Sequence, residues 1–383
     1  MISPKAFYET LSEAGVNFAV GVPDSLLKEF CAYVDAALPA DRHLIAANEG
    51  TAVGMAAGVH LSTDGVPLVY LQNSGLGNTI NPLLSLADPE VYGLPMVLLV
   101  GWRAEPGVKD EPQHVKQGRV SPAMLDAMEI PWKSLDGDPD TADEHARWAV
   151  REARERSGPV VLLARKGAFG KAEEKRASEA PAADRLSREY AIEVVTDSLP
   201  DEATVVSTTG HISRELYEQR VRAGQDRASD FLTVGSMGHS SQIALGIALT
   251  KRDHPVVCLD GDGAVLMHMG GLATAGVSGA ENFVHVVLNN GVHGSVGGQP
   301  TVGLEVSLAS VARACRYPFV QGPVTSEAAI RDAIAGGLAQ PGPAFVEVQV
   351  QPGARDDLGR PKETPAENKA MFVERLRGLS GAR

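Results

Sequence analysis

Two residues with metal-binding side chains stand 28 positions apart in the second half of this 383-residue chain. Asp262 lies in Gly261-Asp262-Gly263, directly after the apolar run 256–259, and Asn290 follows the apolar run 284–289. Such runs predict buried parallel strands, whose carboxyl ends bind ligands in α/β proteins. A carboxylate and an amide oxygen suit Mg²⁺ or Ca²⁺, and the glycines let backbone N–H groups approach a phosphate. The alternative is a strand-ending turn with a helix cap, which is the usual role of an isolated Gly-Asp-Gly.

The rest of the sequence predicts the frame that positions these residues. Apolar, β-branched runs alternate with segments whose apolar residues recur every three or four positions, which is typical of parallel sheets covered by helices on both faces. Strands are predicted at Asn17–Val22, His43–Ala47, Pro67–Gln72, Pro95–Trp102, Glu129–Leu135, Pro159–Arg165, Thr204–Thr208, Phe231–Gly235, Pro255–Asp260, Phe283–Asn289, Pro318–Gly322 and Ala344–Val350. Helices are expected at Ser25–Val34, Ala142–Arg156 and Ser326–Ala339, among others. We therefore predict an α/β protein with two domains, 1–168 and 190–383, each built on a roughly six-stranded parallel sheet and joined by a charged linker, 169–189.

The two halves also resemble each other. A shift of 188 residues lays Asn48–Gly75 over Ser236–Gly263 without a gap, and eight of the 28 positions are identical. Gly and Ala are common in this chain, so some of these matches can arise by chance. A duplication would nevertheless give two similar α/β halves and a pseudo-symmetric crevice for a ligand.

Composition narrows the classes of function. The chain is 44% hydrophobic and 22% charged, as in globular proteins, and its net charge of −13 argues against a general nucleic-acid binder. The apolar run Val91–Trp102 contains Gly93 and Pro95 and is too short to span a bilayer, and residues 1–15 have no signal-peptide core. The three cysteines are far apart, so they imply neither a disulfide framework nor a thiolate metal site. We expect a soluble, cytoplasmic protein with neither a nucleic-acid nor a membrane partner.

Gly-Asp-Gly followed by Asn-Asn after 25 to 30 residues resembles the cofactor motif of the thiamine diphosphate-dependent decarboxylases. The resemblance implies that Asp262, Asn290 and the backbone carbonyl of Val292 hold the metal ion. It also implies an activating Glu in the other domain, and Glu49, in Ala47-Asn48-Glu49-Gly50-Thr51-Ala52, matches that context. Considered alone, Glu49 would be read as a plain carboxylate at a helix N-terminus, which the helix dipole favours; the cofactor motif in the other half reverses this.

Further cofactor-binding positions follow from the same resemblance. Met237, in Gly235-Ser236-Met237-Gly238, takes the place of the bulky apolar residue beneath the cofactor, and Gly235 the place of the carbonyl that holds its aminopyrimidine. A methionine at this position also fits a simple role in the core. The full implied set is Glu49, Thr208, Gly235, Ser236, Met237, Gly261, Asp262, Gly263, Ala264, Asn290 and Val292.

Other segments resemble the subfamily of phosphonopyruvate and sulfopyruvate decarboxylases, over essentially the whole chain. They are Gly21–Leu27, Gln72–Asn78, Gly101–Arg103, Lys109–His114, Ser236–His239, Gly297–Thr301 and Asp357–Pro361. This resemblance implies decarboxylation of 3-phosphonopyruvate to phosphonoacetaldehyde and CO₂, as in phosphonate natural-product biosynthesis, with sulfopyruvate as the alternative substrate. The pattern leads us to expect an acidic residue after Val292-His293, where this chain has Gly294.

A phosphonate or sulfonate needs a positive counter-charge. The candidate substrate residues are Ser25, Asn78, Arg103, Lys109, His114 and Arg360. Asp24 is a candidate for proton transfer or for a helix N-cap, and His293 is a candidate because an imidazole titrates near neutral pH. Each single Arg or Lys also fits a solvated surface charge.

The family places its cofactor between subunits, so the resemblance implies a homodimer or homotetramer with Glu49 and Asp262 supplied by different chains. Two other readings stay open. A non-catalytic diphosphate-binding module would need Asp262 and Asn290 but no carboxylate at Glu49. A carboligase or acetolactate-type synthase would normally carry a middle domain, for which this length leaves no room.

Overall fold

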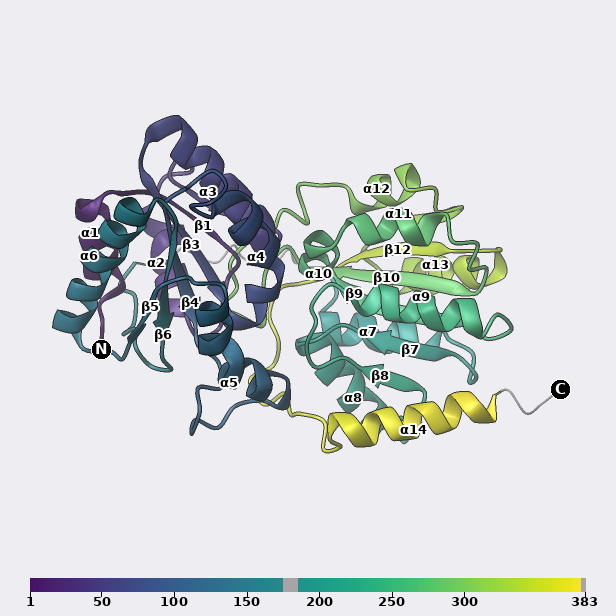
Figure 1. Ribbon diagram of the computed structural model, residues 1–383. Helices are drawn as coiled ribbons and strands as arrows, with labels where there is room; N and C mark the ends of the chain where they lie inside the picture. Colours follow the sequence, from purple (N-terminus) through teal and green to yellow (C-terminus); the bar gives the residue numbers. More distant parts are fainter. Residues whose placement is uncertain (175–184, 380–383) are drawn as a thin grey trace. The chain divides into compact units, whose positions relative to one another are not determined.

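The chain forms two compact units, Met1–Ser178 and Glu179–Arg383. The computed structural model describes residues 1–174 and 185–379 (Figure 1). The division falls inside the predicted linker 169–189, of which residues 175–184 lie outside the described part.

The described ends of that linker pack on the unit next to them. The ring of Phe169 meets that of Phe7 edge-on, at 5.4 Å between centroids. At the other end, Leu186 forms a β-bridge with Val350. Each described end of the linker therefore packs against the unit that it adjoins in sequence.

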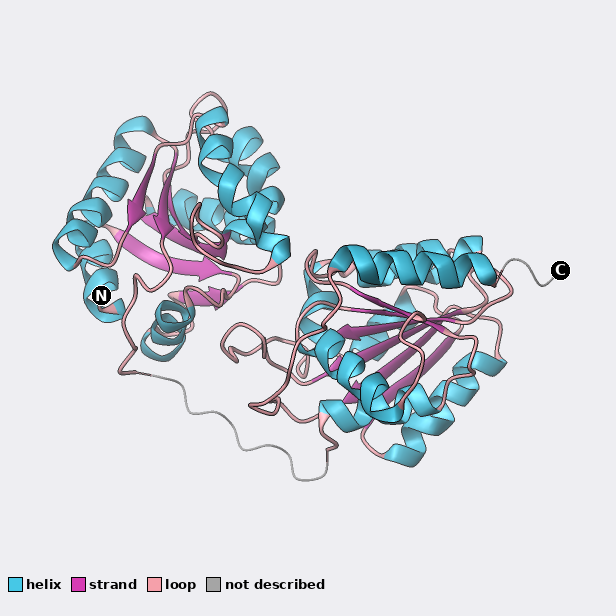
Figure 2. Ribbon diagram, turned by 90° about the horizontal axis from the view of Figure 1, so that it is seen from below, coloured by secondary structure: helices cyan, strands magenta, loops and turns pink. Residues whose placement is uncertain are grey.

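The first unit is a parallel six-stranded sheet in the order β2-β1-β3-β4-β6-β5, with helices on both faces (Figure 2). Its strands are β1 Val16–Gly21, β2 His43–Ile45, β3 Val66–Gln72, β4 Met96–Gly101, β5 Trp132–Leu135 and β6 Pro159–Ala164. Its helical segments are α1 Pro4–Ala14, α2 Lys28–Ala37, α3 Glu49–Thr63, η1 Asn73–Gly75, α4 Leu76–Pro82, η2 Leu83–Ala87, α5 Pro112–Ala127 and α6 Pro139–Arg156. Because α1, α2 and α6 cover one face and α3, α4 and α5 the other, the central strands are buried on both sides and are continuously apolar.

The second unit repeats this topology. Its sheet order is β11-β12-β10-β9-β7-β8, which, renumbered within the unit and read from the other edge, is again 2-1-3-4-6-5. Its strands are β7 Thr204–Ser207, β8 Asp230–Leu232, β9 Val256–Gly261, β10 Phe283–Asn289, β11 Phe319–Val324 and β12 Ala344–Gln349. Its helices are α7 Arg188–Asp197, α8 His211–Ala223, α9 Ser240–Thr250, α10 Asp262–Met267, α11 Gly270–Gly276, α12 Leu308–Ala314, α13 Glu327–Ala339 and α14 Pro365–Gly378. The predicted pair of six-stranded parallel sheets is confirmed, and the shared strand order agrees with a duplication.

In each unit the chain leaves one strand, visits the edge of the sheet, and returns on the other side of that strand. This switch lies between β1 and β3 in the first unit and between β7 and β9 in the second. The carboxyl ends of strands beside such a switch form the ligand-binding crevice of α/β sheets. The residues that follow β1, β3, β7 and β9 are therefore the first candidates for a ligand site.

Several element boundaries differ from the predictions by up to three residues, and the starts of α2 and β5 are two of them. Helix α2 begins at Lys28 and not at Ser25; residues 25–27 form a separate turn, in which the N–H groups of Leu26 and Leu27 bind the carboxylate of Asp24. Strand β5 begins at Trp132 and not at Glu129, because Glu129 has a φ of 55° and interrupts the extended backbone.

In the described residues, no helix is long and apolar enough to cross a membrane.

Candidate active site

Glu49 is a buried carboxyl group at the first residue of α3. Asn48 caps this helix, with its Oδ1 accepting the N–H of Gly50 at 2.8 Å, and Glu49 itself is 6% exposed. Its Oε2 accepts a 2.7 Å hydrogen bond from Nδ2 of Asn78. A Cβ placed on Gly75 would lie 2.4 Å from its Oε1, so the turn before α4 touches the other oxygen. Burial raises the pKa of Glu49, so this carboxyl group holds a proton more readily than a solvated one.

Asp24 is fully buried just after β1. Its carboxylate accepts the N–H groups of Leu26 and Leu27, both at 3.2 Å, and Nε2 of Gln72 at 2.6 Å. Burial raises the pKa of Asp24 despite these bonds. Its oxygens thus organise the turn 25–27, and α2 itself begins three residues later than predicted, with Leu27 as its N-cap residue.

Arg103 follows β4 and joins three parts of the first unit. Its Nη1 donates to Oγ of Ser25 at 2.7 Å, and its Nε donates to Oδ2 of Asp110 at 2.7 Å, with a second bond from Nη2 to Oδ1. Burial opposes ionisation of Asp110, but the hydrogen bonds and charge of Arg103 hold the pKa of that carboxyl below its usual value. Because Ser25 accepts from the guanidinium, its own hydroxyl proton is left to donate elsewhere.

The other candidate substrate residues differ in their surroundings. His114, in the first turn of α5, has its pKa lowered to about 4 by burial, so it is neutral at pH 7. Lys109 is exposed in the loop before α5, whereas Asn78 is engaged with Glu49. Arg360 is exposed in the segment between β12 and α14 of the second unit.

In the second unit, Asp262 and Asn290 lie together at the ends of neighbouring strands. Asp262 begins α10 directly after β9 and is 2% exposed. Its Oδ1 accepts the backbone N–H of Asn290 at 3.4 Å, and its Oδ2 accepts the hydroxyl of Thr301. Burial raises the pKa of Asp262 to about 6. A carboxylate in this position is stabilised by a divalent cation, which supplies the missing positive charge.

The turn after β10 carries Val292 and His293. Oδ1 of Asn290 accepts the N–H of Val292 at 3.1 Å, and the carbonyl of Val292 accepts the N–H of Gly294 at 2.9 Å. A carbonyl oxygen has a second lone pair, so this bond leaves it able to bind a metal ion. His293 is buried, which lowers its pKa to about 4 and keeps the ring neutral.

Met237 and His293 both lie against Gly263. A Cβ on Gly263 would lie 3.2 Å from Cε1 and Nδ1 of His293 and 3.3 Å from Cε of Met237. Ser236, in the same turn as Met237, is exposed and has a φ of 54°. Gly235 is half-buried in that turn, and Ala264 is buried one residue beyond Gly263. Met237 and Gly263, one from each of the predicted segments 235–237 and 261–264, therefore meet at the start of α10.

Thr208 and His211 add buried polar atoms to the switch between β7 and β9. Within residues 1–174 and 185–379, neither Oγ1 of Thr208 nor Nδ1 of His211 has a hydrogen-bond partner, although both atoms are buried. Helix α8 starts at His211 behind Gly210, which gives it no side-chain cap. Buried polar atoms and an uncapped helix N-terminus are the features that an anionic group satisfies.

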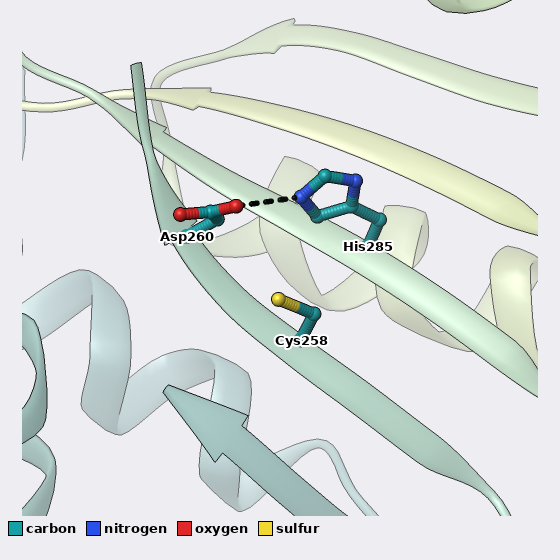
Figure 3. A group of neighbouring side chains, drawn as sticks. All are labelled: Cys258, Asp260 and His285. Atoms are coloured by element: carbon teal, nitrogen blue, oxygen red, sulfur yellow. Dashed lines mark hydrogen bonds and ion pairs between the residues drawn. The ribbon is translucent and has the colours of Figure 1, made fainter. Parts of the chain in front are cut away.

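A buried group lies behind the Gly-Asp-Gly turn. Figure 3 shows Cys258 and Asp260 on β9 beside His285 on β10. Their potential metal-ligand atoms lie within 4.8 Å of one another. Nε2 of His285 and Oδ2 of Asp260 are 3.2 Å apart, and Oδ1 of Asp260 accepts the N–H of Gly261 at 3.0 Å. Both oxygens are engaged, which favours a hydrogen-bonded support of the turn over a metal site. The three cysteines, all in the described part, form no disulfide.

The arrangement in the second unit fits a diphosphate held by a divalent cation. Its donor set of carboxylate, amide and carbonyl oxygens suits Mg²⁺ or Ca²⁺, and Thr208 and the start of α8 offer donors for phosphate oxygens. The sequence analysis missed Asp110, Thr301 and His211. Asp110 and Thr301 lie in Lys109–His114 and Gly297–Thr301, two segments that resemble the family, but Thr301 reaches Asp262 only through the fold of a long loop.

Comparison with known proteins gives matches in both units. The model "Thiamine pyrophosphate enzyme, N-terminal TPP binding domain" matches residues 4–130, and "Thiamine pyrophosphate enzyme, C-terminal TPP binding domain" matches residues 210–348. A phosphonopyruvate decarboxylase of Streptomyces viridochromogenes is 41% identical, with 97% of this chain and 94% of that protein covered. One of Streptomyces hygroscopicus is 38% identical, with 98% and 94% covered. A sulfopyruvate decarboxylase of Methanosarcina acetivorans is 27% identical, with 96% of each covered.

Proposed function

The chain belongs to the thiamine pyrophosphate (thiamine diphosphate) enzyme family, and we propose that it decarboxylates 3-phosphonopyruvate to phosphonoacetaldehyde and CO₂. The choice of substrate rests on the sequence similarity to relatives that are phosphonopyruvate decarboxylases. Identity to the phosphonopyruvate decarboxylases is 41% and 38% over nearly the whole chain, against 27% for the sulfopyruvate decarboxylase. Sulfopyruvate, which would give sulfoacetaldehyde, is the second candidate.

Asp262, Asn290 and the carbonyl of Val292 would hold Mg²⁺, with Ca²⁺ as a substitute, and the buried donors at Thr208 and the start of α8 would hold the diphosphate. When bound, thiamine diphosphate supplies the nucleophilic carbon and the electron sink for decarboxylation. Met237 would pack beneath it, beside Gly263.

Glu49 would hold or accept a proton at the aminopyrimidine ring. Its buried carboxyl group has a raised pKa, and Asn78 fixes Oε2, which leaves Oε1 as the atom for that proton. A non-catalytic diphosphate-binding module has no use for such a carboxyl group, so Glu49 favours an enzyme.

Arg103 and Ser25 would bind the anionic end of the 2-keto acid. The guanidinium is fixed by Asp110 and directed to Ser25, so both groups present donors at the carboxyl ends of β1 and β4. Lys109 and Arg360 remain candidates for further counter-charge. His114 and His293 are neutral at pH 7, so they would act as hydrogen-bonding groups and not as cations.

Glu49 and Asp262 lie in different units, and we propose that each active site takes them from two chains of a homodimer or homotetramer. The family resemblance supports this assembly, and closed symmetry is the usual state of soluble oligomers. A cytoplasmic location stays a prediction from the sequence.

The test is an assay of purified protein with Mg²⁺, thiamine diphosphate and each acid. We expect release of CO₂ and aldehyde from phosphonopyruvate, with kcat/KM at least tenfold above that for sulfopyruvate, and loss of activity after chelation of the metal. A higher kcat/KM for sulfopyruvate would transfer the assignment to the second candidate. Cofactor binding without turnover of either acid would favour the non-catalytic module.

A further inference from the structure

Glu347 is a buried carboxylate on β12 for which the reaction has no evident use. It is 2% exposed, and both its oxygens accept hydrogen bonds. Oε1 accepts Nδ2 of Asn289 at 2.9 Å, and Oε2 accepts the backbone N–H of Ala309 at 3.0 Å. Burying a carboxylate is costly unless such bonds satisfy it.

These two partners stand at the two ends of one loop. Asn289 is the last residue of β10, and Ala309 is the second residue of α12. The chain between them includes Asn290 and Val292, the residues proposed to bind the metal ion. Glu347 therefore joins the start of the metal-binding loop, residues 290–308, to its end.

Asn289 carries this contact into the loop. Its Nδ2 also donates to the carbonyl of Gly303 at 2.6 Å, and its Oδ1 accepts the N–H of Gly291 at 3.2 Å. The three bonds use both polar atoms of the amide. One side chain thus fixes the beginning of the loop and its returning segment together.

The returning segment rests directly on the metal-binding carboxylate. The N–H of Gly303 donates to Oγ1 of Thr301 at 3.0 Å, and that hydroxyl donates to Oδ2 of Asp262. A Cβ on Gly303 would lie 2.5 Å from the same Oδ2. A continuous chain of contacts therefore runs from Glu347 through Asn289 and Gly303 to Asp262.

We propose that Glu347 is a positioning residue that closes the metal-binding loop at its base and so sets the affinity of the site for Mg²⁺. The proposal depends on the proposed function in one respect: that Asp262, Asn290 and Val292 bind the metal ion. Groups that orient metal ligands without touching the metal typically change metal affinity by about 10- to 100-fold when they are removed.

The experiment compares Glu347→Ala, Glu347→Gln and Asn289→Ala with a matched control, Asp230→Asn. Asp230 is also a buried carboxylate of the second unit, but it pairs with Arg220, at 3.0 Å from Nε to Oδ2. Amide hydrogen exchange of residues 290–308 is measured in the metal-free protein. Mg²⁺ affinity is measured by calorimetry in the presence of thiamine diphosphate, and KM is measured at saturating Mg²⁺.

We expect Glu347→Ala to speed exchange of the loop at least tenfold and to raise the Kd for Mg²⁺ about 10- to 100-fold. KM for phosphonopyruvate, measured at saturating Mg²⁺, should change less than twofold. Glu347→Gln should lie between wild type and Glu347→Ala, because an amide oxygen still accepts from Asn289 whereas its NH₂ group faces the N–H of Ala309. Asp230→Asn should lower Tm without changing loop exchange or Mg²⁺ affinity.

Glu347 is an ordinary core residue if its variants lower Tm as Asp230→Asn does while loop exchange and Mg²⁺ affinity stay at wild-type values. Should Glu347→Ala not fold, Glu347→Gln and Asn289→Ala decide by the same two measurements. Loop exchange needs no turnover, so faster exchange in a protein that processes neither acid would support the role of Glu347 and contradict only the proposed function.

Discussion

The amide of Asn78 donates a 2.7 Å hydrogen bond to Oε2 of Glu49, so one oxygen of this buried carboxyl group is fixed by α4. The other oxygen faces Gly75, in the turn before that helix. Glu49 is therefore held in one orientation by two neighbouring turns of the same segment, and small changes there should act on its chemistry.

Gly75→Ala should reduce kcat by roughly 10- to 100-fold with little loss of cofactor affinity. The new methyl group would lie 2.4 Å from Oε1 of Glu49 and would push the carboxyl group aside. Gly77→Ala is the control, because a Cβ on Gly77 meets no atom within 4 Å. Steady-state kinetics and calorimetry of both variants test this, and equal kcat values for the two would contradict it.

Glu49→Gln should lower kcat by roughly 10²- to 10⁴-fold, the range typical of a lost acid–base group, and should leave folding intact. Glutamine keeps the acceptor for Asn78 but cannot exchange a proton. Calorimetric binding of thiamine diphosphate with Mg²⁺ should change much less than kcat, because Asp262 and Asn290 anchor the diphosphate end. A variant with near wild-type turnover would remove the proposed role.

Arg103→Ala should raise KM for phosphonopyruvate roughly 10- to 100-fold, because a charge-assisted hydrogen bond contributes about 1.5–3 kcal/mol. Arg103→Lys should recover only part of this loss, since a lysine cannot form the paired bonds to Asp110. The control is Arg147→Ala, which removes a surface arginine paired with Glu13. If both alanine variants leave KM unchanged, the substrate's anionic group is bound elsewhere.

Asp262 should make metal binding depend on pH near its folded pKa of about 6. Protons compete with Mg²⁺ for this carboxylate, so Mg²⁺ affinity should fall as the pH drops below about 6. In the metal-free protein, the folding stability should change with pH in the opposite direction. The folded pKa lies above the unfolded value, so protonation favours the folded state, and the stability that Asp262 contributes declines as the pH rises from 3.8 to about 6. Asp262→Asn should abolish both effects, as calorimetry and denaturant unfolding across this range would measure.

A mixture of Glu49→Ala and Asp262→Ala proteins should regain activity after subunit exchange. Each variant by itself lacks one essential group in every site, whereas one site of a mixed dimer would contain both. Exchange is verified by mass spectrometry of the mixed oligomer. Verified exchange without activity, or a monomer that turns over substrate in light scattering, would rule out a site shared between chains.

The fold could be predicted from the sequence because parallel strands buried on both faces appear as uninterrupted apolar runs. β4 is the clearest case, since all six of its residues are buried. The start of α2 could not be predicted, because it depends on Asp24 accepting two N–H groups in a turn that also involves Gln72 of β3.

The site residues show the same division. Asp262 and Asn290 could be found because each directly follows a recognisable strand. Thr301 could not, because it reaches Asp262 across 39 residues, through a contact that only the folded loop makes. The charge state of His114 could not be predicted from the sequence either, because the burial that lowers its pKa arises only in the folded protein.

The two units have the same strand order, but no strand of one sheet pairs with a strand of the other in the described parts of the chain. Cutting the backbone between residues 174 and 185 would therefore break no ladder of hydrogen bonds within either sheet. Each half would keep its own pair of apolar cores, one holding the buried acid and the other the proposed cation site. In the described residues, each sheet and its two apolar cores are thus built from one continuous half of the chain.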